Sequence, residues 1–87
     1  MTYRKPLVFT RHALDALEER ALAPEWIDAA VFEPEWEESE PDHPAVVRRF
    51  RAVPQHNNRI LRVACVETAE NIRILTAFFD RRARRPQ

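Results

Sequence analysis

The chain contains no glycine among its 87 residues. Glycine is the residue that adopts positive backbone φ angles most easily, and several phosphate-binding loops depend on it. Phosphate-binding loops of that kind are therefore excluded. Because every turn has to be made by proline, asparagine, aspartate or alanine, we expect turns where these residues gather.

Two short helices are predicted in the first part of the chain. Thr10 is a suitable N-cap for a helix that runs to about Arg20. Pro24 suits the first turn of a second helix, and Pro34 ends it. Residues 7–9 form a short apolar entry before the first helix and are consistent with a strand.

The segment from Glu33 to Pro44 is acidic and contains three prolines. Proline removes a backbone donor, and repeated acidic side chains repel one another. We therefore expect a loop or an irregular edge segment here. Glu33–Asp42 should be poorly ordered, or packed only through Trp36.

The hydrophobic period changes after this segment. Residues 45–53, 59–67 and 72–79 each have the composition of a strand, and the residues between them have turn chemistry. Hairpin-length connections predict an antiparallel meander. In the second of these strands, Leu61 and Cys65 share one face.

The order of these elements predicts an α+β fold in a single domain of residues 1–87. Two N-terminal helices should pack on one face of an antiparallel sheet of three to four strands. The other face has to accept several arginines, and we expect this open face to be a binding surface. Residues 80–87 form a basic tail.

Charge is segregated along the chain. Residues 1–47 hold four bases and eleven acids, a net charge of −7, and residues 48–87 hold ten arginines and three acids, a net charge of +7. A basic half of this size favours a polyanionic partner, with RNA first among the candidates.

Other features limit the class of protein. No apolar run reaches the length of a membrane span, so no membrane partner is expected. The single cysteine, Cys65, excludes an intramolecular disulfide and a cysteine-based metal cluster. This pattern suits the reducing cytoplasm. We expect neither a metal nor a cofactor.

Several segments, taken in order, resemble domain-of-unknown-function family 4258. The resemblance extends from Phe9 to Arg82 and is carried by Phe9-Thr10-Arg11-His12-Ala13, Glu18-Glu19-Arg20, Pro24-Glu25-Trp26-Ile27, Pro34, Arg48-Arg49-Phe50-Arg51 and Leu75-Thr76-Ala77-Phe78-Phe79. The family is similar in fold to the RelE/ParE-like toxins. The resemblance implies a toxin of a bacterial toxin–antitoxin pair, with an antitoxin protein as partner.

A metal-independent endoribonuclease needs a proton-transfer group and cations for the phosphate. His12, near the N-terminus of the first helix, is the candidate for proton transfer. Arg20 is the second candidate catalytic residue, as a ligand of the phosphate. Arg49, Arg51 and Arg82 are candidate RNA-binding residues. Structural roles remain open for the same residues. His12 could bond a backbone carbonyl, Arg20 could cap its helix, and Arg49 and Arg51 could form cross-strand ion pairs.

The sequence thus leads to two hypotheses. The first is a cytoplasmic, RNA-engaging toxin-like domain that acts as a metal-independent endoribonuclease. The second is a non-enzymatic domain that binds a protein partner through its open sheet face or its acidic segment. Self-association into a homo-oligomer is compatible with both.

Overall fold

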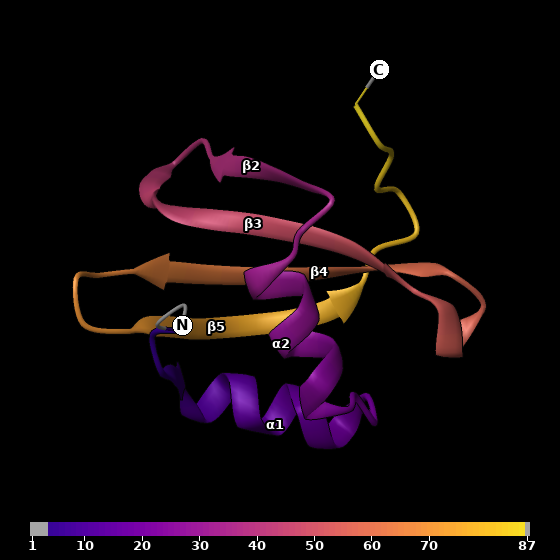
Figure 1. Cartoon of the computed structure of the whole chain (residues 1–87), viewed down its shortest axis with the longest axis horizontal. Coiled ribbons are helices and arrows are strands. Elements are labelled where there is room, and N and C mark those ends of the chain that lie inside the picture. Colours follow the sequence, from indigo (N-terminus) through magenta and orange to yellow (C-terminus); the bar gives the residue numbers. More distant parts are fainter. Residues whose placement is uncertain (1–3, 87) are drawn as a thin grey trace.

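A five-stranded sheet and two helices make up the fold (Figure 1). The computed structural model describes residues 4–86. Its elements are β1 (Leu7–Phe9), α1 (Arg11–Glu19), α2 (Pro24–Phe32), β2 (Trp36–Glu40), β3 (His43–Val53), the short 3-10 helix η1 (Pro54–His56), β4 (Arg59–Glu67) and β5 (Ile72–Phe79). The strands lie in the order β1-β5-β4-β3-β2.

The sheet is mixed, which corrects the predicted fold class of two helices followed by an antiparallel sheet of three to four strands. β1 precedes both helices and pairs in parallel with β5, with Leu7 opposite Ile72 and Phe9 opposite Ile74. The pairing continues past the strand, since Thr10 N donates to the Ile74 carbonyl at 3.1 Å. The possible strand at residues 7–9 is therefore confirmed. Three residues are too few to show a period of two, so its parallel pairing with β5 is visible only in the tertiary structure.

The acidic segment is also more regular than predicted. β2 is an edge strand that pairs antiparallel with β3, with a register shift between Ser39 and Glu40. The alternative of an irregular edge segment is therefore confirmed, and the expectation of a loop or a poorly ordered segment is wrong. Its prolines do not interrupt the strand, because Pro34 precedes β2 and Pro41 follows it. Trp36 is buried and stacks on Phe50 at 4.7 Å between ring centroids, which confirms its predicted role as the anchor.

Both predicted helices are present. The Thr10 hydroxyl accepts a hydrogen bond of 3.1 Å from Ala13 N, so Thr10 caps α1 as expected. α1 lies beside β5 and β1, whereas α2 packs across β3 and β4. Within residues 4–86, neither helix is long and apolar enough to cross a membrane.

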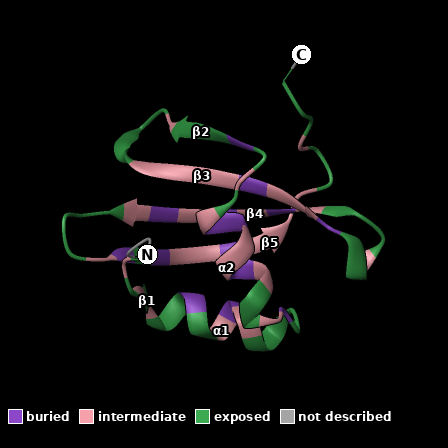
Figure 2. Ribbon diagram, in the orientation of Figure 1, coloured by how far each residue is buried: buried purple, intermediate pink, exposed green. Residues whose placement is uncertain are grey.

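One hydrophobic cluster joins α1 and α2 to the sheet (Figure 2). Leu61, Val63 and Cys65 on β4 are fully buried, which confirms that this side of the strand faces the core. The other members are Ala13, Leu22, Ile27, Ala30, Val31, Val53, Ile72, Ile74 and Ala77. Burial of these side chains supplies most of the driving force that fixes α2 on the sheet.

The turns use asparagine and alanine where other proteins often use glycine, as the sequence predicts. Positive φ angles occur at Ala21, Asn57 and Asn58, with values of 52°, 55° and 57°. Asparagine tolerates this region better than most residues, whereas alanine is less suited to it. The hairpin between β3 and β4 is therefore held in its left-handed conformation by the two asparagines.

Candidate nucleic-acid interface

His12 and Arg20 lie at the two ends of α1. His12 is exposed, and its side chain forms no hydrogen bond or ion pair with any other residue between 4 and 86. The predicted structural alternative, a bond from His12 to a backbone carbonyl, is therefore not seen in this part of the chain. Arg20 is exposed at the C-cap, where its backbone N–H donates to Ala16 O at 3.0 Å.

Arg49 and Arg51 share a face of β3, as predicted, but it is the face that α2 covers. Their partners on β4 are Val63 and Leu61, which are fully buried. Arg49 Nη1 donates to the Val31 carbonyl at 3.2 Å, so it reaches the end of α2. These two arginines therefore do not belong to an open binding face. This corrects the expectation that the open face carries them.

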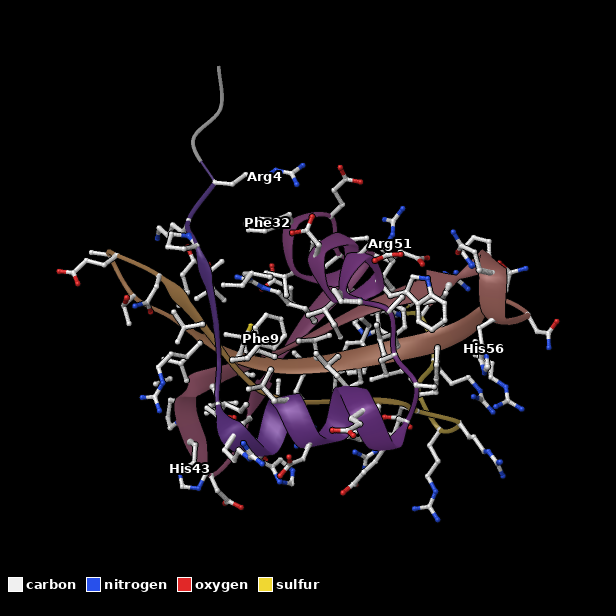
Figure 3. All side chains as sticks on the ribbon, turned by 90° about the horizontal axis from the view of Figure 1, so that it is seen from below. Arg4, Phe9, Phe32, His43, Arg51 and His56 are labelled. Carbon is white, nitrogen blue, oxygen red and sulfur yellow. The ribbon has the colours of Figure 1, made fainter. Side chains whose placement is uncertain are left out.

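Arg51 has the same placement. Its Nη1 donates to the carbonyl of Glu33, the C-cap of α2, at 2.6 Å. Figure 3 shows the Arg51 side chain beside α2.

Arg49 is the centre of an ion-pair network. Its guanidinium contacts Glu67 at 2.8 Å and Glu37 at 3.3 Å, and only 12% of its side chain is exposed. Burial disfavours the charge, but the hydrogen bonds and charges of the two carboxylates outweigh burial and raise the Arg49 pKa. The cross-strand pair with Glu67, weighed from the sequence as the structural alternative, is confirmed. Lys5 extends the network, because its Nζ contacts the other Glu67 oxygen at 2.8 Å.

Other arginines of the basic half are also paired with acids. Arg48 Nε donates to Glu40 at 2.9 Å, since β2 and β3 are neighbours. Arg62 contacts Asp80 at 3.2 Å. The Arg62–Asp80 pair lies within residues 48–87, whereas Arg48 and Arg49 pair with acids of β2. Because these β2 acids belong to residues 1–47, the cationic surface is smaller than the net charge of residues 48–87 suggests.

A pocket remains where unpaired arginines meet. It has a volume of about 340 Å³ and lies between the β3–β4 turn and the segment that follows β5. Its lining consists of Asn57, Asn58, Arg59, Ile60, Phe79, Asp80, Arg81, Ala83 and Arg84. We refer to this set of residues as the basic pocket.

The charge of the basic pocket is positive. Within residues 4–86, Arg59, Arg81 and Arg84 form no ion pair, and all three are exposed. The acid in the lining, Asp80, is occupied by Arg62 and by the backbone N–H of Arg82, which it accepts at 2.9 Å. Burial opposes the negative charge of Asp80, yet these hydrogen bonds outweigh it and lower the Asp80 pKa. The Asp80 carboxylate therefore pairs with none of the three guanidinium groups. Arg84 uses Nη1 for hydrogen bonds to the carbonyls of Arg81 and Ala83, at 3.1 and 3.0 Å, which leaves its other guanidinium nitrogens for a ligand.

The wall formed by the β3–β4 turn is held by packing. His56, the last residue of η1, stacks on Phe79 at 4.5 Å between ring centroids, and Trp26 lies 6.0 Å from both rings. Figure 3 shows His56 at this turn. Asn58 N donates to the Val53 carbonyl at 2.9 Å, which closes the turn. The two asparagines therefore have a fixed position at the rim of the basic pocket.

The opposite wall is the C-terminal segment, which is tied to the sheet. Arg85 Nε donates to Glu35 Oε1 at 2.7 Å, and the second oxygen of Glu35 accepts from Ala52 N at 2.6 Å. Arg82, the predicted RNA-binding residue of the tail, is exposed and lies in this segment, although it does not line the basic pocket. The tail is thus tied to the sheet at Arg85.

The predicted catalytic group and the basic pocket lie apart. α1 begins near the N-terminal end of β5, whereas the β3–β4 turn and the tail lie at the other end of the sheet (Figure 1). His12 is the second residue of α1 and does not line the basic pocket. The structure brings together Arg59, Arg81 and Arg84, and it does not bring His12 to them.

The sequence interpretation treated the residues of the basic pocket separately, as a turn and as a basic tail. The predicted meander already indicated that these two segments would meet. In an antiparallel hairpin the start of β4 meets the end of β5, and Leu61 is opposite Phe79. Bases that follow the last strand therefore meet the base that begins the strand before it. No group of three or more potential metal ligands is found within residues 4–86.

These features define a small α+β domain with a mixed five-stranded sheet and a basic pocket at one end of it. The chain belongs to domain-of-unknown-function family 4258, whose sequence pattern matches residues 9–79. The match extends from the end of β1 to the end of β5, so it includes the whole meander. Comparisons with curated proteins and with solved structures found no match.

Proposed function

We propose that this protein is an RNA-engaging, toxin-like domain and that it contacts RNA through the basic pocket. The observation that carries the proposal is the convergence of Arg59, Arg81 and Arg84, which form no ion pair within residues 4–86, on one hollow. Guanidinium groups bind phosphate oxygens through paired, directional hydrogen bonds. Three such groups around a concave surface favour a phosphate-bearing ligand over a neutral one.

The toxin part of the proposal rests on resemblance. The sequence resemblance implies a fold similar to that of the RelE/ParE-like toxins, and a toxin of this kind acts together with an antitoxin protein. We therefore propose an antitoxin as the protein partner. The family is a domain of unknown function, so the support for the toxin role is the fold resemblance.

A salt titration tests RNA engagement. Binding of a fluorescently labelled RNA, measured by anisotropy, should weaken as salt increases, with a log–log slope of about −0.7 for each phosphate contact. Arg59→Ala and Arg84→Ala should each weaken binding and make the slope shallower. Arg73→Ala is the matched control, because Arg73 is an exposed β5 arginine outside the basic pocket. Equal losses in all three variants, or binding that salt does not change, would contradict the proposal.

RNA cleavage is a separate part of the hypothesis and needs a proton-transfer group. His12 is exposed, which leaves its imidazole accessible to a substrate, but it lies away from the basic pocket. Incubation of end-labelled RNA with the wild type and with His12→Ala, followed by electrophoresis, tests this part. Cleavage that persists in His12→Ala would remove His12 from the catalytic role.

One observation favours the second candidate function, a protein-interaction domain. Arg48, Arg49 and Arg62 are engaged by acids of the same chain, so a large part of the basic half is not available to RNA. If RNA does not bind even at low salt, the hypothesis of a protein-interaction domain is favoured. Co-purification with the product of a neighbouring gene is then the decisive measurement.

A further inference from the structure

We propose that the basic pocket accepts one unpaired nucleotide, so that the RNA bound by this protein is single-stranded at the point of contact. This inference rests on the proposed function and specifies its ligand. Its first support is size. A volume of about 340 Å³ lies within the range of roughly 300–1,000 Å³ that is typical of small-molecule sites, at the lower end, where one nucleotide fits.

The second support is the combination of apolar, amide and guanidinium side chains in the lining. The apolar side chains of Ile60 and Phe79 form part of it, and the amides of Asn57 and Asn58 lie in the adjoining turn. An amide both donates and accepts hydrogen bonds, and the polar edge of a base offers both kinds of partner. The arginines of the basic pocket supply the groups that bind phosphate. One site therefore offers complements to the apolar, edge and phosphate parts of a nucleotide.

The third support is rigidity on the side that would meet the base. Asn57 and Asn58 are both held at positive φ, and the turn is closed by the bond from Asn58 N to the Val53 carbonyl. One neighbour of Phe79 is His56, stacked at 4.5 Å, so the aromatic part of the lining is packed and does not depend on the ligand for its position. A preorganised site loses little conformational entropy on binding.

These features discriminate between forms of RNA. In a duplex the bases are paired and stacked, and the protein meets mainly phosphates and ribose hydroxyls. A flat basic patch would suffice for such a ligand. A hollow with two amides and apolar side chains adds affinity only when a base leaves the stack and enters it. We therefore expect preference for single strands.

The test compares a fluorescein-labelled single-stranded RNA with a blunt duplex of the same sequence, at the same salt concentration, by anisotropy. We expect the single strand to bind about tenfold more tightly, since contacts to one base are worth roughly 1–3 kcal/mol. The double variant Asn57→Gly, Asn58→Gly keeps a turn that needs positive φ and removes both amides. It should remove most of this preference, because its loss of affinity should be much larger for the single strand than for the duplex.

Arg59→Ala distinguishes the two levels of the hypothesis, because it should weaken both RNAs. Equal affinity for the two RNAs, with loss of both in Arg59→Ala, would overturn the single-strand inference and leave RNA engagement in place. Absence of binding to either RNA would overturn the proposed function itself. A glycine variant that melts at the wild-type temperature and keeps its preference would show that the amides do not contact the base.

Discussion

Arg49 on β3 donates a hydrogen bond of 2.8 Å to Glu67, the last residue of β4. This contact gives a structural role to Arg49, which the sequence indicated as a candidate RNA-binding residue. A guanidinium that is held by Glu67 and by the Val31 carbonyl has little capacity left for phosphate. Arg49 therefore ties β3 to β4 and α2, and the arginines that converge on a pocket without an ion pair within residues 4–86 are Arg59, Arg81 and Arg84.

Removal of Arg49 should lower stability. Arg49→Ala leaves Glu67 and Glu37 without their shared partner and the Val31 carbonyl without a donor. Because the site is only partly buried, we expect a loss of about 1–3 kcal/mol in the free energy of unfolding. Urea denaturation measures it. Arg73→Ala, at an exposed position, is the control, and equal unfolding midpoints for the two variants would show that the network contributes nothing.

Acid should weaken the same network. Hydrogen bonds from Lys5 and Arg49 lower the Glu67 pKa in the folded state. A carboxylate with a lowered pKa stabilises the fold above its ordinary pKa of 4.5, and this contribution disappears as the pH falls through the lower folded value. Glu67→Gln should therefore lose less stability than the wild type between pH 6 and about pH 3.

The control for acid sensitivity is Glu70→Gln, since Glu70 is exposed and forms no ion pair within residues 4–86. Its unfolding should retain the wild-type pH dependence. Identical curves for Glu67→Gln and the wild type would rule out a contribution of Glu67 to acid sensitivity.

Thr10 should contribute to the stability of the fold. Its hydroxyl accepts from Ala13 N at 3.1 Å and donates to the Leu75 carbonyl at 3.3 Å, so it caps α1 and binds the helix to β5. Thr10→Ala should cost about 1–2 kcal/mol in thermal or urea unfolding. Thr10→Ser keeps the hydroxyl and should retain most of the stability. If the serine variant is as unstable as the alanine variant, the loss comes from the methyl group instead.

The C-terminal wall of the basic pocket should depend on Glu35. A hydrogen bond from Ala52 N and the contact with Arg85 outweigh burial and lower the Glu35 pKa. Glu35→Gln removes the charge that holds Arg85, and trypsin should then cleave the segment after Arg81 faster. Mass spectrometry of the products measures the rate. The control is Glu38→Gln on β2, the edge strand that begins directly after Glu35, and this variant should be cleaved at the wild-type rate. Faster cleavage of this variant would point to a general loosening of β2.

His12→Ala should leave the fold intact. The His12 side chain is exposed and makes no bond to another residue within 4–86, so the free energy of unfolding should change by less than about 0.5 kcal/mol. RNA affinity should also stay at the wild-type value, because His12 does not line the basic pocket. A loss of RNA cleavage in this otherwise unchanged variant is the result that would identify His12 as catalytic.

The amino-acid sequence by itself determined the local structure. The bounds of β4 and β5 follow from apolar runs between turn residues, and the start of α1 follows from the capping chemistry of Thr10. The burial of Cys65 was also predictable, because Cys65 lies on the apolar face of a recognisable strand. The anchoring role of Trp36 was predictable because it is a lone aromatic residue in a polar segment.

Only the tertiary structure decided how distant segments meet. β1 is too short to show a period, and its place in the sheet depends on its pairing with β5. The acidic residues of β2 are stable in a strand because the arginines of β3 lie beside them, a compensation that neither segment shows alone. Arg49 lies on the sheet face that α2 covers, and the position of α2 is a tertiary feature. The basic pocket lies where the start of β4 meets the end of β5. Local chemistry is encoded within a few residues, whereas charge pairing and hollows are set by contacts between residues far apart in the chain.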